Sequence, residues 1–404
     1  MKICAPEQIK AVVVEVPTSK SIANRLLIIK ALAGSGEIID LSKAKDTKVL
    51  NVLLSKMPSV LDVGHAGTAF RFLTAYLAIQ KGTFTLTGSD RMKQRPIGIL
   101  VDALTKLGAN ITYLENEGFP PLKIIGAPLK GREVTVNSEV SSQFISALML
   151  IAPYLENGLK INLQGKQVSQ PYLDMTASLM TKCGVDVLMD KKSIYISKSS
   201  YKLQSIKVEK DWSAIAFWYE MVCLGRLSSL QIKGVQEKSI QGDKAVIELF
   251  KNLGVETIFN DGNLCLSYKQ SLVSNHFSSI DFTDFPDLTQ PYVVALSCLE
   301  TFQKITGIST LKNKETNRGA ALKQELAKFG GDVLVSDDEI KMISKINQNS
   351  KLPIKTYQDH RMAMAFAPLA FVFGEIDIEN PSVVEKSYPE YWNQLQNIGF
   401  RLIV

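Results

Sequence analysis

The sequence of 404 residues lacks the features that mark several common classes of protein. Its five cysteines are odd in number and form no CxxC pair, so we expect a cytoplasmic location with neither a disulfide framework nor a zinc site. No stretch of about 18 residues is apolar and free of charge and glycine. The N-terminus has no signal-peptide pattern either. We therefore expect no membrane association.

Concentrated charge is also missing. Lysine and arginine total 46 against 40 acidic residues, a formal charge of +6, yet no run of like charge occurs. A nucleic-acid-binding protein usually clusters such an excess, so no nucleic-acid partner is expected. The pattern GxxxxGK[ST] is absent as well, which argues against a P-loop nucleotide enzyme. The dispersed cations either converge on small anionic substrates or form a solvated basic surface.

What the sequence does contain is an internal repeat. An amphipathic helix, a glycine and a β-branched strand recur five times, as in LVDALTKLGANITYL and AVIELFKNLGVETIF. Each glycine is expected to end its helix in the left-handed conformation. The five glycines are Gly108, Gly184, Gly254, Gly330 and Gly399.

A second series of six helices, nearly free of charge, alternates with the first. Helices that are apolar on every side are buried, so this series is expected inside and the amphipathic series outside. Six α/β repeats result, the first shortened by a hairpin before residue 61, arranged as one solenoid or as two groups of three. The buried helices begin near Ser19, Gly67, Ser141, Asp211, Asp287 and Asp359.

The polar starts of these buried helices suggest anion binding. A helix N-terminus carries about half a positive charge and unpaired N–H groups, so several starts that converge would trap an anion. Ordinary capping explains any single start equally well. Nearby motifs add cations and hydrogen-bonding groups, namely TSKSIANR, HAGTAFR, RMKQRPIG, SSQF, VSQPY, FPDLTQ, KETNR, DHR and VEKSY.

The motif order SKSxxNR, AGTAxR, LTGxxRMKxRPIGxLVDAL, SSQF, QGD, KET and DHRMAM resembles that of the 5-enolpyruvylshikimate-3-phosphate synthases, a family of enolpyruvyl transferases. The resemblance implies an α/β fold of two similar domains. Each domain would hold three βαβαββ units around buried parallel helices, an inside-out α/β barrel. Residues 1–16 and 212–404 would form one domain, and residues 17–211 an inserted domain that carries the SKS, AGT, RPIG and SSQ motifs.

The resemblance also implies a reaction. The enolpyruvyl group of phosphoenolpyruvate passes to the 5-hydroxyl of shikimate 3-phosphate, and phosphate leaves through a tetrahedral ketal intermediate. This step belongs to the shikimate pathway of aromatic amino-acid biosynthesis and is the target of glyphosate. No cofactor or metal is implied, and a monomer is expected.

Site residues follow from the same resemblance. Shikimate 3-phosphate would be held by Lys20, Ser21, Arg25, Ser141, Ser142, Gln143, Ser169, Tyr172, Asp287 and Lys314. Phosphoenolpyruvate would be held by Lys20, Gly67, Arg95, Gln143, Arg318, Arg361 and Lys386. The catalytic residues would be Asp287, Glu315 and Lys20, with the two carboxylates handling protons.

Several positions depart from the family pattern, and two other functions remain open. The departures are His65, Phe72, Gln170, Thr310 and Asn317. One alternative is UDP-N-acetylglucosamine enolpyruvyl transferase, which uses a cysteine in a mobile loop, whereas the cysteines of this chain fall in apolar helices, a strand and the N-terminus. The other is a catalytically inactive binding protein of the same fold, although the expected cations and carboxylates are all retained.

Overall fold

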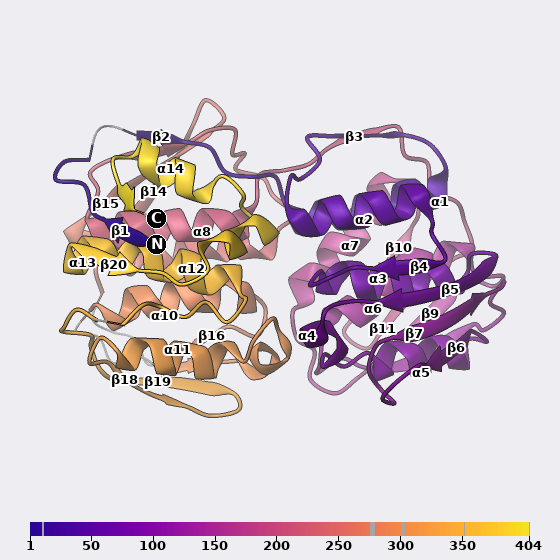
Figure 1. Cartoon of the computed structure of the whole chain (residues 1–404). Helices are drawn as coiled ribbons and strands as arrows, with labels where there is room; N and C mark the ends of the chain where they lie inside the picture. Colours follow the sequence, from indigo (N-terminus) through magenta and orange to yellow (C-terminus); the bar gives the residue numbers. More distant parts are fainter. Residues whose placement is uncertain (10–11, 275–278, 300–303, 351, 404) are drawn as a thin grey trace. The chain divides into compact units, whose positions relative to one another are not determined.

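The computed structural model describes residues 1–9, 12–274, 279–299, 304–350 and 352–403 of an α/β protein (Figure 1). The chain forms two compact units. Met1–Ser19 and Glu209–Val404 make the terminal unit, and Lys20–Val208 makes the inserted unit. In the described part of the chain, no helix is both long and apolar enough to cross a membrane.

Three buried helices form the interior of the inserted unit. They are α1 (Lys20–Ala33), α3 (Gly67–Ala78) and α6 (Ser142–Ile151), and they pack against one another. The sequences of α3 and α6 contain a single charged residue, Arg71, which explains their burial, because a helix without a polar face gains nothing from contact with water. In α1 the apolar run from Leu26 to Ile29 is buried, whereas Lys30 is exposed. The helices with a polar face are α2 (Lys45–Lys56), α5 (Gly98–Lys106) and α7 (Gln170–Lys182), and the one-turn helix α4 spans Asp90–Lys93.

Two four-stranded sheets of the inserted unit share one topology, in which a parallel pair is followed by an antiparallel hairpin. The first has the order β4 (Val60–Asp62), β5 (Gly82–Thr87), β7 (Leu122–Gly126), β6 (Asn110–Tyr113). The second has the order β8 (Glu133–Asn137), β9 (Leu159–Gln164), β11 (Ser193–Ile196), β10 (Val187–Met189).

The third sheet of the inserted unit is smaller. It consists of the parallel pair β3 (Glu37–Ile39) and β12 (Ser205–Lys207). Residues 57–59 alone join α2 to β4, so no hairpin follows α2 within Lys20–Val208, all of which the structure describes.

The terminal unit repeats the arrangement of buried helices. Its interior contains α8 (Trp212–Gly225), α10 (Thr289–Ser297) and α12 (His360–Phe366), which pack together (Figure 1). Its other helices are α9 (Val246–Lys251), α11 (Arg318–Ala327), α13 (Ala370–Phe373) and α14 (Tyr391–Asn397). The 3-10 turns among the described residues are η1 (Ala152–Tyr154), η2 (Gly242–Ala245), η3 (Gln270–Leu272), η4 (Pro286–Leu288), η5 (Ser309–Asn313), η6 (Ala367–Leu369) and η7 (Pro381–Lys386).

Two sheets of the terminal unit have the same parallel-pair-and-hairpin topology. One has the order β2 (Val12–Val14), β13 (Leu230–Ile232), β15 (Asn263–Tyr268), β14 (Val255–Asn260). The other has the order β16 (Ser279–Asp281), β17 (Lys304–Thr306), β19 (Glu339–Ser344), β18 (Asp332–Val335).

The two ends of the chain complete the last sheet. Strand β1 (Lys2–Cys4) lies between β20 (Glu375–Asp377) and β21 (Arg401–Ile403) and is antiparallel to both. Figure 1 accordingly shows the N- and C-termini side by side. The N-terminal strand therefore takes the place that the second strand of a hairpin occupies in the other sheets.

The glycines of the repeat behave as the sequence predicts. All five follow the amphipathic helices with positive φ, from 79° at Gly330 to 105° at Gly399. Glycine reaches this left-handed region without the steric cost that a Cβ atom brings. The prediction that each one ends a helix is confirmed.

One acidic side chain lies in the core of the terminal unit. Glu220, in the middle of α8, is fully buried, and neither of its carboxyl oxygens has a hydrogen-bond partner among the described residues. Burial raises the pKa of Glu220 well above its ordinary value, since a charge without a partner is costly in an apolar interior. The side chain is therefore protonated at neutral pH.

Replacing Glu220 by glutamine should stabilise the protein more as the pH rises. Above about pH 4.3 the unfolded chain ionises this glutamate while the folded chain keeps it protonated, so the native protein loses stability until its raised pKa is reached. The free energy of unfolding of Glu220→Gln, relative to wild type, should grow by about 2 kcal/mol between pH 5 and pH 7. Urea unfolding at both pH values measures this, with the exposed Glu237→Gln as control. An advantage that does not change with pH would contradict an ionisable, protonated Glu220.

Candidate functional site

The helix starts of the terminal unit meet around the guanidinium of Arg318. This side chain opens α11 and is 1% exposed. Its Nη1 donates to Asp287 Oδ1 at 2.8 Å, and its Nη2 donates to Glu315 Oε2 at 2.9 Å. Its Nε donates to Asp359 Oδ2 at 2.8 Å. Burial disfavours the charged form, but the three carboxylates outweigh it and raise the pKa of Arg318.

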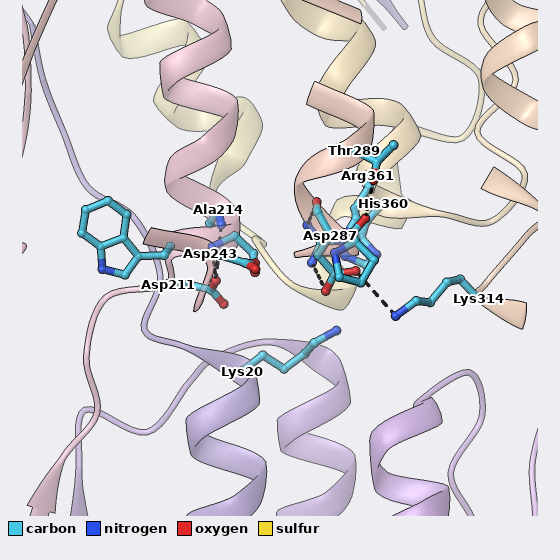
Figure 2. Close-up of polar contacts among 12 residues, drawn as sticks. Lys20, Asp211, Ala214, Asp243, Asp287, Thr289, Lys314, His360 and Arg361 are labelled. Atoms are coloured by element: carbon cyan, nitrogen blue, oxygen red, sulfur yellow. Dashed lines mark hydrogen bonds and ion pairs between the residues drawn. The ribbon is translucent and has the colours of Figure 1, made fainter. Parts of the chain in front are cut away.

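Asp287 receives three cations. It lies in η4, directly before α10, and its Oδ2 accepts a hydrogen bond from Arg361 Nη2 at 2.9 Å (Figure 2). The Nζ of Lys314 lies 3.9 Å from its Oδ1, on the side that also contacts Arg318. Burial opposes ionisation of this carboxyl group, but these positive charges hold its pKa well below the ordinary value. Asp287 is therefore an anion at neutral pH.

The residues at the start of α12 position the side chains of Asp359, Arg361 and Lys386. Asp359 is its N-cap, and the Oδ1 atom accepts the backbone N–H of Arg361 at 2.9 Å while Oδ2 holds Arg318. Arg361 Nη1 in turn donates to the backbone carbonyl of Asp287 at 3.0 Å. Lys386 is buried and donates from Nζ to the carbonyl of Gln358 at 3.3 Å. Two cations therefore lie at one helix start, where the backbone already favours negative charge.

In the inserted unit, a buried arginine is held by neutral groups. Arg25 donates from Nε to Thr176 Oγ1 at 2.7 Å, from Nη1 to the carbonyl of Ser21 at 2.9 Å, and from Nη2 to the carbonyl of Tyr172 and Ser146 Oγ, both at 3.3 Å. Burial lowers the pKa of Arg25 to about 10, so the side chain remains a cation at neutral pH. These four acceptors carry no charge to neutralise it, which favours an anionic ligand nearby.

Gly67 and Arg95 lie against each other at the start of α3. A Cβ atom on Gly67 would lie 2.8 Å from Arg95 Cζ, closer than real Cβ contacts allow. Arg71 supports the same turn by donating to the carbonyl of Gly67 at 3.3 Å and to that of Pro96 at 2.9 Å. The missing side chain therefore lets the Arg95 guanidinium approach the helix start.

The serines of the SSQF motif begin α6. Ser141 is the N-cap, and its Oγ accepts the backbone N–H of Gln143 at 3.2 Å. Gln143 Nε2 donates to Thr68 Oγ1 at 3.2 Å, which joins the starts of α6 and α3. Ser142 is buried at the first position of the helix. Neutral donors and acceptors of this kind suit hydroxyls and phosphate oxygens.

Two further helices of the inserted unit, α1 and α7, begin at the motif residue Lys20 and next to the motif residue Ser169. Lys20 begins α1, and its Nζ lies 3.1 Å from Asp46 Oδ2. Ser169 precedes α7 in the left-handed conformation, with φ of 57°, and is buried. Both residues therefore lie at helix starts, which the sequence predicts for Lys20 but not for Ser169.

Comparison with known proteins decides the family. The family model described as EPSP synthase (3-phosphoshikimate 1-carboxyvinyltransferase) matches residues 51–395. A 3-phosphoshikimate 1-carboxyvinyltransferase of Bacteroides fragilis (strain YCH46) is 43% identical over 408 residues, covering 100% of this chain and 98% of that protein. The chain belongs to the EPSP synthase family. A 3-phosphoshikimate 1-carboxyvinyltransferase of Sulfurovum sp. (strain NBC37-1) is 35% identical over an alignment of 422 residues that covers 96% of this chain and 96% of that protein.

Solved structures agree with this membership at the level of the fold. An EPSP synthase from Acinetobacter baumannii has a TM-score of 0.76 at 21% identity and covers 99% of both chains. The family and enzyme class that the motifs predict are thus confirmed, and the α/β fold with them. Neither the UDP-N-acetylglucosamine enolpyruvyl transferase nor an inactive binding protein is favoured.

The structure also shows side chains to which the sequence motifs assign no role. Asp359 stands in the DHR motif, and only the structure reveals that it both caps α12 and binds Arg318. Asp46 pairs with Lys20 from α2, which no local pattern indicates. Thr68 stands beside Gly67 and accepts from Gln143. Its place in the AGT motif is the signal that could have identified it.

Proposed function

We propose that this EPSP synthase family member transfers the enolpyruvyl group of phosphoenolpyruvate to the 5-hydroxyl of shikimate 3-phosphate and releases phosphate. The observation that carries the proposal is Asp287, a buried carboxylate kept ionised by Arg318, Arg361 and Lys314. A reaction between two polyanions needs several fixed cations, together with groups that move protons. The reaction needs no cofactor and no metal ion.

The proton steps fit the paired carboxylates Asp287 and Glu315. In the first step the 5-hydroxyl oxygen bonds to C2 of phosphoenolpyruvate, its proton leaves, and C3 gains a proton, which gives the tetrahedral ketal. In the second step the C2–O bond to phosphate breaks and C3 loses a proton, which forms the enol ether. Asp287 is ionised and can therefore accept a proton, although the cations that lower its pKa also make it a weaker base. Glu315 shares the Arg318 guanidinium with it.

Binding roles follow the charge of each group. We assign shikimate 3-phosphate to Lys20, Ser21, Arg25, Ser141, Ser142, Gln143, Ser169, Tyr172, Asp287 and Lys314. We assign phosphoenolpyruvate to Lys20, Gly67, Arg95, Gln143, Arg318, Arg361 and Lys386. The bidentate geometry of arginine supports the second set, because both ends of phosphoenolpyruvate are anionic.

The finer architecture is part of the same proposal. Four sheets with one strand order support two domains of three βαβαββ units, each an inside-out barrel around buried parallel helices. The two-stranded sheet of β3 and β12 supports a first unit shortened by a hairpin. We place the domain boundaries at residues 16/17 and 211/212, three residues away from the limits of the two compact units at 19/20 and 208/209. A cytoplasmic monomer is the form in which we expect the enzyme to act.

A coupled phosphate-release assay tests the function. The chain should release phosphate from phosphoenolpyruvate with shikimate 3-phosphate as acceptor, but not with UDP-N-acetylglucosamine. Asp287→Ala and Lys20→Ala should each lower turnover at least about 100-fold, because an ionised base or a cation at the reacting groups is lost. Circular dichroism checks that both variants fold. Turnover with the UDP-sugar alone would refute the assignment, and wild-type rates in both variants would refute the site.

The close contact between Gly67 and Arg95 predicts that a methyl group added at Gly67 weakens the binding of phosphoenolpyruvate. In Gly67→Ala the new Cβ atom should push the flexible Arg95 guanidinium aside without unfolding α3. We expect the KM for phosphoenolpyruvate to rise about tenfold, as one charge-assisted contact weakens. Glyphosate should inhibit the wild type competitively, and its inhibition constant should rise in the variant.

Initial rates at saturating shikimate 3-phosphate measure both constants. Gly98→Ala is the matched control, because a Cβ atom there would meet Gly118 Cα at an ordinary 3.5 Å. If Gly67→Ala left the inhibition constant for glyphosate unchanged, Gly67 and Arg95 would not belong to the phosphoenolpyruvate site.

A further inference from the structure

A tight turn of the backbone precedes α12, and neither of its two central residues is glycine. The backbone N–H of Asp359 donates to the carbonyl of Thr356 at 2.8 Å, which closes the turn around Tyr357 and Gln358. Both central residues have positive φ, 52° at Tyr357 and 57° at Gln358. Turns with two left-handed central residues favour glycine, asparagine and aspartate, because a larger side chain makes this conformation costly. Contacts with other parts of the unit must therefore hold this turn in place.

The turn provides two of the contacts that shape the site. Its last residue, Asp359, caps α12 and accepts a hydrogen bond from Arg318 Nε at 2.8 Å. The carbonyl of Gln358 accepts a hydrogen bond from Lys386 Nζ at 3.3 Å. The conformation of the turn therefore decides where the Asp359 carboxylate and the Lys386 ammonium group lie.

The hydroxyl of Tyr357 fastens the turn to the end of α11. It donates to Glu325 Oε1 at 2.6 Å, and Gln324 Oε1 lies 2.8 Å from it. Partial burial and the Glu325 carboxylate raise the pKa of Tyr357, so the hydroxyl keeps its proton at neutral pH. The hydroxyl therefore remains a hydrogen-bond donor to Glu325.

Glu325 is itself held in one position. It is fully buried, and its Oε2 accepts hydrogen bonds from Lys328 Nζ at 2.5 Å and from the backbone N–H of Lys355 at 3.0 Å. Lys328 Nζ also donates to the carbonyl of Pro353 at 2.8 Å. Since Pro353, Lys355 and Tyr357 are alternate residues, the whole segment that leads into the turn is tied to the end of α11.

Helix α11 thus holds the turn from both sides. At its start Arg318 binds Asp359, and about two turns later Glu325 binds Tyr357. Because the helix is rigid, it fixes these two contacts relative to each other. Loss of the Tyr357 contact should let the turn relax towards a conformation that its residues prefer.

We propose that Tyr357 is a positioning residue for the binding of phosphoenolpyruvate: its hydroxyl holds the left-handed turn, and the turn holds the Gln358 carbonyl against Lys386. The identity of this anion rests on the proposed function. Tyr357 acts through the backbone of the turn and through Lys386, not through contact with the substrate.

The substitution Tyr357→Phe removes the hydroxyl and keeps the ring. The turn should then relax and misplace Lys386, so the KM for phosphoenolpyruvate should rise about tenfold, as one charge-assisted contact weakens. The KM for shikimate 3-phosphate should stay close to the wild-type value. A merely structural loss would instead lower the fraction of active enzyme, and with it kcat, while both KM values remained unchanged. An unchanged KM for phosphoenolpyruvate would overturn the proposal.

A second substitution tests whether the strained turn is the link. Gln358→Gly keeps the backbone carbonyl that Lys386 uses, and glycine adopts positive φ without steric cost. In the double variant Tyr357→Phe/Gln358→Gly the turn should form without the hydroxyl, and the KM for phosphoenolpyruvate should return close to the wild-type value. A double variant as impaired as Tyr357→Phe would contradict a role that runs through the turn.

Tyr268→Phe is the matched control in the same unit. The hydroxyl of Tyr268 also contacts a glutamine, donating to Gln270 Oε1 at 2.8 Å. This variant should have the wild-type KM for phosphoenolpyruvate. A rise equal to that in Tyr357→Phe would count against the proposal, because the loss of any tyrosine hydrogen bond would then have the same effect.

Amide hydrogen exchange, followed by NMR, reports on the turn without turnover. The backbone N–H of Asp359 closes the turn, so it should exchange about tenfold faster in Tyr357→Phe and slow again in the double variant. If the chain releases no phosphate with any acceptor, the proposed function fails, but the exchange rates still test the hydroxyl and the turn. An Asp359 amide that exchanges at the wild-type rate in Tyr357→Phe would overturn the proposal even in an active enzyme.

Discussion

The terminal unit depends on one buried cation and the three carboxylates that neutralise it. Arg318 is almost fully buried, and taking a guanidinium and its partners out of water costs several kcal/mol per ion unless the geometry is good. Each of its three nitrogens donates to a different carboxylate, at 2.8–2.9 Å. Because Asp287, Glu315 and Asp359 come from separate segments of the chain, this one side chain aligns the starts of α10, α11 and α12.

The inserted unit also contains a buried arginine, but the groups that hold it are neutral. Arg25 is as buried as Arg318, but carbonyls and hydroxyls surround it, and its pKa is lowered rather than raised. A buried cation held by neutral acceptors retains its attraction for an anion, whereas Arg318 already shares its charge with three acids. We therefore expect anions to gain most from the Arg25 cluster, while the Arg318 cluster sets protonation states.

The sequence predicts those features of the structure that correspond to a recognisable pattern of neighbouring residues. Uncharged stretches identify the buried helices, and glycines with positive φ mark the ends of the outer ones. The insertion of β1 between β20 and β21 joins residues more than 370 positions apart, and no local pattern encodes it. The site follows the same rule: motifs identify Asp287 and Arg318, whereas Asp46 is recognised only through its ion pair with Lys20, which is distant in sequence.

The substitution Arg318→Lys tests the central claim most directly. Lysine keeps the positive charge, but a single ammonium group cannot reproduce the fork of three N–H donors that holds three carboxylates in place. Single-turnover phosphate release from phosphoenolpyruvate and shikimate 3-phosphate should fall at least about 100-fold in a folded variant, because the reacting groups lose their alignment. Release within a fewfold of the wild-type rate would contradict the account, since charge alone would then be sufficient.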